Sequence, residues 1–212
     1  MLLLEMIAIF IVSYLFGAIP FGFIIGKAKG IDIREHGSKN IGSTNVTRTL
    51  GKKWGMLCFL LDFLKGFLPS FIAIFILPKY LDLCGNYADM SVILAIIGSF
   101  VGHIFPVYLK FKGGKGVATG AGALLALTPL SVIIGLAGWV IIFKISRYVS
   151  VASILAAVIV AAMTTILSAS NTYPVSLTLQ IFVAVICLIA ILKHKTNIVR
   201  LLNGTENRFE KK

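Results

Sequence analysis

Three short segments of this 212-residue chain concentrate the side chains that could do chemistry. The first, residues 37–48, reads GSKNIGSTNVTR and combines glycines, amides and hydroxyls with Arg48. Glycines let a ligand approach main-chain N–H groups, Ser38 offers a hydroxyl, and a guanidinium has a planar fork that suits phosphate. A solvated turn that caps a helix is the alternative. The density of donors favours an anion site, with contacts from Asn40, Gly42, Thr44 and Asn45.

The second segment places three glycines around a lysine, directly before an apolar stretch. It reads FKGGKG over residues 111–116 and follows a Gly-His-Ile-Phe-Pro sequence that contains His103. Backbone N–H groups, a helix N-terminus and the Lys115 ammonium would converge there on an anion. The segment is not a Walker A loop, because no Gly-Lys-Ser/Thr follows at the required spacing. A flexible turn whose lysine reaches the interface is the alternative. Further predicted contacts are Lys112, Gly113, Gly114 and Gly116.

The third segment, residues 194–206, reads HKTNIVRLLNGTE. If it is helical, His194, Asn197 and Arg200 share one face at positions i, i+3 and i+6. Glu206 is an anion among cations, so we expect it to pair with an arginine or lysine and to order the tail. A basic tail beside the membrane, without catalytic function, is the alternative.

Asp62 and Lys65 lie inside an apolar run, where ionisable residues are a functional hypothesis by default. Their spacing of three residues also permits a mutual ion pair, so a scaffold role is equally favoured. The histidines are too scattered to suggest a metal site, and no metal or cofactor is expected. The three cysteines, Cys58, Cys84 and Cys187, are expected to serve packing.

The composition predicts that these segments belong to a membrane protein. The chain is 58% hydrophobic and 13% charged, against about 25% charged in soluble domains. Charge-free stretches cover residues 6–26, 116–143 and 148–192. No basic residue precedes Lys27, so the first stretch is expected to span the bilayer rather than to act as a cleaved signal. The net charge is +12, and the basic residues lie on loops beside the predicted spans. This placement favours anionic lipids and substrates over nucleic acid as partners.

The distribution of basic residues predicts the topology. They gather in residues 27–53, 110–115, 144–148 and 193–212, and the positive-inside bias places all four segments on the cytoplasmic side. A single crossing by residues 116–143 would put the last two segments outside. This stretch is therefore expected to turn back at Thr128-Pro129, with arms of about 12–14 residues that are short for a bilayer. The other spans are expected at about 3–26, 54–77, 88–109, 149–168 and 173–192.

Two short crossings and a re-entrant hairpin both satisfy these charges, and we favour the crossings. The predicted fold is an all-α polytopic membrane protein with seven transmembrane helices, two of them short. Its N-terminus would lie outside and its C-terminus in the cytoplasm, and residues 1–212 would form a single domain.

Together the segments GSKNIGSTNVTRTLGKKWG, GHIFPVYLKFKGGKGVATG and HKTNIVRLLNGTENRF closely resemble the bacterial acyl-phosphate:glycerol-3-phosphate acyltransferases, the PlsY type. The resemblance runs over nearly the whole chain, in the same order and spacing. It implies a seven-span enzyme of the cell (inner) membrane whose active site faces the cytoplasm. Such an enzyme moves a fatty acyl group from acyl phosphate to the sn-1 hydroxyl of glycerol 3-phosphate. The products are lysophosphatidic acid and phosphate, in the first acylation of phospholipid biosynthesis, and a monomer is expected.

By motif position, the resemblance implies that the catalytic residues are Ser38, Arg48, Lys115, His194 and Asn197, and that Glu206 is structurally required. The chain has Lys39 where the family often has Gly, and Lys195-Thr196 where Arg-Glu or similar is common. These departures bear on substrate preference rather than on the chemistry.

The general base is left open, because the chain lacks the H-x-x-x-x-D motif of the soluble-facing acyltransferases. A phosphate oxygen of the acyl donor could take the proton, with His194 as the rival.

Two other classes of function would also use basic loops beside spans. A transporter for a phosphorylated metabolite predicts an inverted repeat and charges near the midplane, but no repeat is found and only Asp62 and Lys65 qualify. A non-catalytic lipid-binding protein explains the basic faces but not the density of Gly, Asn and Ser.

Overall fold

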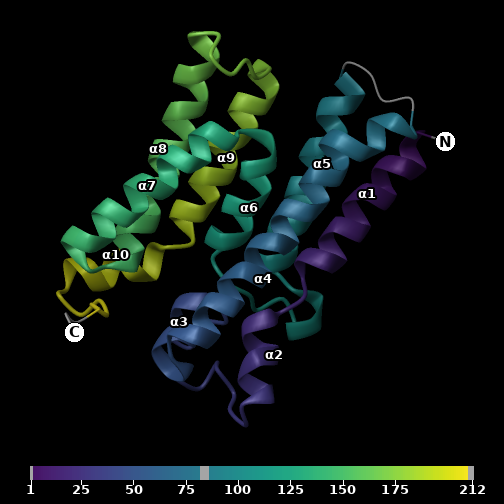
Figure 1. The fold of residues 1–212 in the computed structure, drawn as a ribbon. Coiled ribbons are helices and arrows are strands. Elements are labelled where there is room, and N and C mark those ends of the chain that lie inside the picture. The colour runs from purple at the N-terminus through teal and green to yellow at the C-terminus, as the bar shows by residue number, and fades with distance from the viewer. Residues whose placement is uncertain (1, 82–85, 210–212) are drawn as a thin grey trace. The chain divides into compact units, whose positions relative to one another are not determined.

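A computed structural model describes residues 2–81 and 86–209, and this part of the chain is helical and contains no strand (Figure 1). The helices are α1 (Leu2–Gly17), α2 (Phe21–Ala28), α3 (Ser43–Leu50), α4 (Lys52–Phe71), α5 (Asn86–Ile104), α6 (Val117–Leu127), α7 (Pro129–Ser146), α8 (Val149–Ala169), α9 (Leu177–Leu192) and α10 (Lys195–Leu202). A π-helical turn, Ile72–Ile76, and short 3-10 turns at Leu77–Lys79 and Val107–Leu109 complete the pattern.

The prediction of an all-α membrane protein is confirmed. Five candidate spans are long and apolar enough to cross a bilayer, and a sixth is present if α9 and α10, bent by 51°, count as one. The five are Leu2–Ala28, Lys52–Lys79, Tyr87–Leu109, Pro129–Ser146 and Val149–Ala169.

The stretch 116–143 is two helices, as predicted, because α6 ends at Leu127 and α7 begins at Pro129. Proline suits the first turn of a helix, where its missing N–H is not needed. The prediction that both helices are short is wrong. Helix α6 has 11 residues, roughly 17 Å, but α7 has 18 residues because it continues through Lys144 to Ser146. Of these two helices, only α6 is shorter than the roughly 17–25 residues of a typical transmembrane helix.

The first apolar run is broken, although the sequence predicted one continuous span over 3–26. Helix α1 ends at Gly17 and α2 begins at Phe21. Pro20 lies at the break, where it cannot donate the hydrogen bond that would continue the helix. The short helix α2 then leads directly into the first polar segment.

The chain divides into two compact units, Met1–Leu127 (unit 1) and Thr128–Lys212 (unit 2). The predicted single domain over residues 1–212 stays a prediction. In unit 1, α1 packs along α5 and α4 packs along α6. Glycines permit both contacts: a Cβ at Gly17 would lie 2.2 Å from the Ser99 carbonyl oxygen, and one at Gly66 would lie 2.0 Å from that of Thr119. Small residues at helix contacts are typical of membrane bundles.

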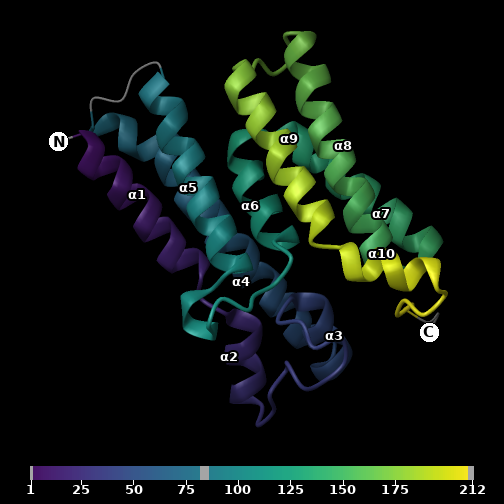
Figure 2. The same cartoon turned by 180° about the vertical axis from the view of Figure 1, so that it is seen from behind.

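In unit 2, α8 packs against both α7 and α9. Trp139 of α7 donates a hydrogen bond from Nε1 to Ser153 Oγ of α8 at 3.1 Å. Figure 2 shows α10 at the end of α7 and α8 where the chain terminates. Of the cysteines, Cys58 and Cys187 are buried and free, and Cys84 lies outside the described residues.

Both polar segments of unit 1 lie at one end of its helices. The two views agree that α2, α3 and the teal segment between α5 and α6 share this end (Figures 1 and 2). The predicted anion-binding groups of unit 1 therefore lie at the same end of its helix bundle.

Candidate active site

The first polar segment is a folded loop with its own apolar core. We call residues 29–42, between α2 and α3, the serine loop. Two of its side chains, Ile33 and Ile41, are 0% and 4% exposed. They join a buried cluster with one residue each from α2, α3, α4 and the turn before the glycines, namely Ile25, Val46, Cys58 and Leu109. This core fixes the loop against three helices, so its polar backbone is held rather than free.

The Asn45 side chain organises the backbone around Ser38. It is 1% exposed, and its Oδ1 accepts a hydrogen bond from the Ser38 N–H at 2.8 Å. Its Nδ2 donates to the carbonyl oxygens of Ile33, His36 and Asn40 at 3.0, 3.0 and 2.9 Å. These bonds use the amide within the loop. They give Asn45 a positioning role in the loop, and its direct contact with phosphate stays a prediction.

Backbone conformation next to Ser38 explains two residue choices. Gly37 has φ +57°, and a Cβ there would lie 2.3 Å from Asn45 Oδ1, so only glycine fits. Lys39 has φ 59°, a left-handed conformation that costs a non-glycine residue roughly 1–2 kcal/mol. Lys39 therefore adopts a backbone conformation that suits glycine, the residue that the resemblance predicts at this position in the family.

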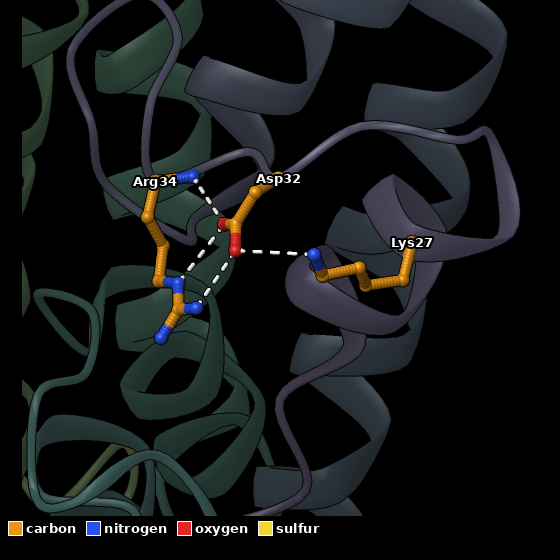
Figure 3. A network of polar contacts seen from close by, with 3 residues as sticks. All are labelled: Lys27, Asp32 and Arg34. Carbon is orange, nitrogen blue, oxygen red and sulfur yellow. Dashed lines mark hydrogen bonds and ion pairs between the residues drawn. The ribbon is translucent and has the colours of Figure 1, made fainter.

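Asp32, in the serine loop, pairs with two basic side chains, Arg34 and Lys27 (Figure 3). It accepts hydrogen bonds from Arg34 Nε at 2.9 Å and Arg34 Nη2 at 2.7 Å, and Lys27 Nζ lies 3.4 Å away. The side-chain hydrogen bonds from Arg34 hold the pKa of Asp32 well below its usual range, and Lys27 adds to this effect. The same contact raises the pKa of Arg34. This carboxylate is ionised and already paired, so it is a poor candidate for a general base.

The remaining residues of the first motif lie at or in α3. Asn40 Oδ1 accepts from the Gly42 N–H at 2.9 Å, which positions the start of the helix. Thr44 is in the first turn of α3 and Arg48 in its last turn, and both are half-buried. Ser38 is also half-buried. The direct contacts of Ser38, Asn40, Gly42, Thr44 and Arg48 with a ligand stay predictions.

The second motif lies against the end of α5. We call residues 110–116 the glycine loop. The Gly114 N–H donates to the His103 carbonyl oxygen at 3.1 Å, and a Cβ at Gly114 would lie 2.1 Å from His103 Nε2. Gly116 has φ +82° and leads into α6. Close packing thus requires the glycines, and Lys115 is held half-buried between two of them while Lys112 is exposed.

Residues Lys195–Leu202 of the third motif form α10, with His194 at its N-cap, so the condition for a shared face of His194, Asn197 and Arg200 is met. Glu206 accepts hydrogen bonds from Asn197 Nδ2 at 2.6 Å and Arg200 Nε at 2.8 Å, which confirms its predicted pairing. It also accepts one from Ser150 Oγ of α8 at 2.9 Å. Burial raises the pKa of Glu206, but these three hydrogen bonds outweigh it, so the pKa is lowered overall.

The tail after α10 is fixed at the end of α7. The Phe209 N–H donates to the Arg147 carbonyl oxygen at 3.1 Å, and the Phe209 ring packs edge-on against Phe143 at 5.7 Å between centroids. Arg200 and Ser150 were not predicted as site residues. Arg200 shares the motif's helical face and could have been found from the sequence, whereas Ser150 is distant in sequence and carries no motif signal.

His194 has a defined tautomer. Its Nδ1 lies 2.8 Å from the Ala190 carbonyl oxygen, which can only accept, so Nδ1 carries the proton. In the neutral ring Nε2 is then the basic nitrogen. His194 and Asn197 are 3% and 5% exposed.

The structure collects the predicted residues in two groups. Ser38, Arg48 and Lys115 belong to unit 1, whereas His194 and Asn197 belong to unit 2. Within residues 2–81 and 86–209, no three His, Cys, Asp or Glu side chains gather as a metal site would require. Within each unit the chemistry available is cationic and hydrogen-bonding, which suits oxyanions and phosphate.

Comparisons with known proteins agree with this chemistry. The family model described as glycerol-3-phosphate acyltransferase matches residues 7–204. A glycerol-3-phosphate acyltransferase of Desulfotalea psychrophila is 45% identical over 203 residues, which cover 95% of this chain and 97% of that protein. One from Aquifex aeolicus is 44% identical over 207 residues, covering 95% and 99%.

Two crystal structures are also similar. They are the glycerol 3-phosphate and lysophosphatidic acid forms of PlsY, an integral membrane glycerol 3-phosphate acyltransferase. Their TM-scores are 0.84 and 0.82, both at 40% identity, over 97% of this chain and 96% of theirs.

The Asn45 network predicts a sharp effect of an isosteric change. Asn45→Asp keeps the acceptor for Ser38 but replaces the amide donor with an oxygen that faces three carbonyls. We expect a loss of at least about 3 kcal/mol, because several buried acceptors lose their donor. Thermal unfolding in detergent measures this loss. Asn40→Asp is the control, because it changes the charge equally but keeps the acceptor for Gly42. Equal stability of the two variants would contradict the role of Asn45.

The Glu206 network predicts a pH dependence. Because folding lowers the pKa of Glu206, the stabilisation by its carboxylate is present above the ordinary value of about 4.5 and is lost as pH falls through the lowered value. Protease cleavage of the tail, followed from pH 7 to pH 3, should accelerate in acid for the wild type. Glu206→Gln should cleave faster at neutral pH and lack this acid step. The same pH profile in both proteins would show that Glu206 does not hold the tail.

Proposed function

Because the chain belongs to the glycerol-3-phosphate acyltransferase family, we propose that it transfers a fatty acyl group from acyl phosphate to the sn-1 hydroxyl of glycerol 3-phosphate. The bond between the acyl carbon and the phosphate oxygen breaks, and an ester bond to the glycerol oxygen forms. The hydroxyl proton leaves with phosphate, and lysophosphatidic acid is the other product.

One observation carries this proposal: two polar loops at one end of the apolar helices of unit 1, each associated with a half-buried cation. Arg48 closes α3 after the serine loop, and Lys115 lies in the glycine loop. Both substrates present phosphate, and both loops combine backbone N–H groups with a cation. Helices in lipid leave the acyl chain in an apolar environment, and its transfer to water costs about 0.8 kcal/mol per CH₂.

The reaction makes modest demands on the protein, because acyl phosphate is a mixed anhydride with a good leaving group. What remains is to align the hydroxyl with the carbonyl and to stabilise the oxyanion and the departing phosphate. Alignment alone could supply roughly 7–11 kcal/mol. We assign charge stabilisation to Arg48 and Lys115, and positioning of the acceptor to Ser38 and Asn197. No metal or cofactor is needed for these steps.

For the topology we propose seven crossings, with the N-terminus outside, the C-terminus in the cytoplasm and the chain a monomer of the cell (inner) membrane. The five long candidate spans, α9 and the short α6 make up the seven. In unit 2 the contact of Phe209 with Arg147 brings the basic tail to the basic connection 144–148, as expected if both face the cytoplasm.

For proton transfer we propose substrate assistance, in which a phosphate oxygen of the acyl donor takes the hydroxyl proton. His194 is the rival, since its Nδ1–H is held by Ala190 and Nε2 is the basic nitrogen. The carboxylates Asp32 and Glu206 are poor alternatives, because each is ionised and bound to arginine.

The proposed activity is tested with purified protein, palmitoyl phosphate and radiolabelled glycerol 3-phosphate, without thioester, ATP or metal. We expect labelled lysophosphatidic acid. Arg48→Ala and Lys115→Ala should each reduce kcat/KM by about 10² or more, as removal of a key electrostatic donor does. Lys79→Ala, an equal charge change in the connection after α4, should leave it unchanged. No product, together with flux of glycerol 3-phosphate across liposomes, would contradict the proposal and favour transport.

Substitution of His194 distinguishes the two proton acceptors. His194→Gln keeps a polar side chain but removes the basic nitrogen. If the substrate phosphate is the base, the variant retains more than a few per cent of kcat with intact substrate binding. If His194 is the base, kcat falls by about 10²–10⁴. Single-turnover kinetics, with KM measured for both substrates, separate these outcomes.

A further inference from the structure

A buried ion pair lies in the interior of unit 1. Lys65 Nζ lies 2.8 Å from Asp62 Oδ1 in α4, and the two residues are 1% and 2% exposed. Charges inside a span are costly, and their attraction often does not repay the desolvation. The pair therefore needs an explanation beyond helix stability, and its other contacts provide one.

Lys65 links the pair to the start of the serine loop. Its Nζ donates a hydrogen bond to the Ile19 carbonyl oxygen at 2.7 Å. Ile19 lies in the break between α1 and α2, where Pro20 interrupts the helical hydrogen bonds. The same Ile19 carbonyl oxygen accepts a hydrogen bond from the Phe21 N–H at 3.2 Å. Lys65 thus adds a second bond at the break, and α2, which starts there, leads directly to the serine loop.

Asp62 links the pair to the glycine loop through His103. Asp62 Oδ1 faces His103 Nδ1 at 3.7 Å, and His103 is 4% exposed. The opposite edge of the same ring, at Nε2, packs on Gly114, and the His103 carbonyl oxygen accepts from the Gly114 N–H. The His103 Nδ1 is buried and has no hydrogen-bond partner among residues 2–81 and 86–209, so the orientation of the ring depends on the Asp62 carboxylate and on packing.

We propose that Asp62, Lys65 and His103 are positioning residues that hold the serine loop and the glycine loop in a fixed relation. The trio joins the origin of α2 to the backbone beside Lys115, with Asp62 and Lys65 on one rigid helix between them. This inference rests on the proposed function only in that the glycine loop binds a substrate phosphate. It adds Asp62 and Lys65, which lie outside the three motifs, and His103 of the second motif to the machinery of the reaction.

A purely structural role makes a different prediction. Replacement of a buried ion pair by apolar side chains of similar size is often neutral or stabilising, whereas removal of one partner leaves an uncompensated charge. If the pair only supports folding, its joint replacement should leave the kinetics unchanged. If it positions the loops, stability is retained while substrate binding suffers, because small displacements of binding groups are expensive.

The test is the double variant Asp62→Leu with Lys65→Met, compared with the wild type in detergent. We expect the thermal midpoint to stay within a few degrees. KM for at least one of the two phosphate substrates should rise about tenfold or more. Ser70→Ala is the matched control, because Ser70 is buried in the same helix and its hydroxyl donates to the Gly66 carbonyl oxygen of that helix. It should change neither KM.

Unchanged KM values in a folded double variant would overturn the proposal, even if the maximal rate fell with the folded fraction. If the double variant does not fold, His103→Gln decides by the same KM criterion. If neither variant folds, the trio serves stability and the proposal is wrong.

Equilibrium binding of glycerol 3-phosphate alone, without acyl donor, is measured in parallel. Weaker binding in the variants supports the positioning role even if the wild type proves unable to use acyl phosphate.

Discussion

The need to satisfy every backbone polar group without help from lipid governs this structure. Helices meet it by internal hydrogen bonds, but a segment that offers its backbone N–H groups to a ligand must leave the helical pattern. Each irregular polar segment is accordingly supported by a buried residue that bonds to its backbone or to its functional groups. The Asn45 side chain does this for the serine loop, the His103 backbone carbonyl oxygen for the glycine loop, and the Glu206 carboxylate for α10 and the tail. Reactive groups can then be held in place at the ends of apolar helices.

The helices contribute rigidity through close contacts. Glycines in α1, α4, α5 and α6 let backbones approach until a single methyl group would collide with a neighbouring carbonyl oxygen. Such contacts fix the relative height of the helices, and therefore the places from which the loops start. Packing of this kind favours one arrangement, because a slide of one helix along its partner would bring larger side chains into the contact.

Much of the fold and of the third motif could be predicted from the sequence, because the responsible signals are local. Apolar runs give the spans, Pro129 marks the break after α6, and the spacing of His194, Asn197 and Arg200 gives one face of a helix. The break at Pro20 was missed because the apolar run continues through it. The length of α7 was misjudged because Lys144 was taken to end the span, although a lysine can extend to the interface.

The supporting residues could not be predicted, because their partners are distant in sequence. Nothing local indicates that the amide of Asn45 turns back into the preceding loop, or that Ser150 reaches Glu206. Likewise, the sequence favoured a self-contained ion pair and a functional site equally for Asp62 and Lys65. Their contacts with Ile19 and His103 depend on packing between α4, α5 and the α1–α2 break.

The central claim is that all the polar chemistry is exposed on one side of the membrane. Cysteine accessibility measures this most directly, with single cysteines at Glu35, Lys112 and Lys195, and a fourth at Thr172, in a protein without its native cysteines. A membrane-impermeant thiol reagent is applied to right-side-out and inverted vesicles. The account predicts that the first three positions label only in inverted vesicles, and Thr172 only in right-side-out vesicles. Labelling of any of the first three from the opposite side would contradict it.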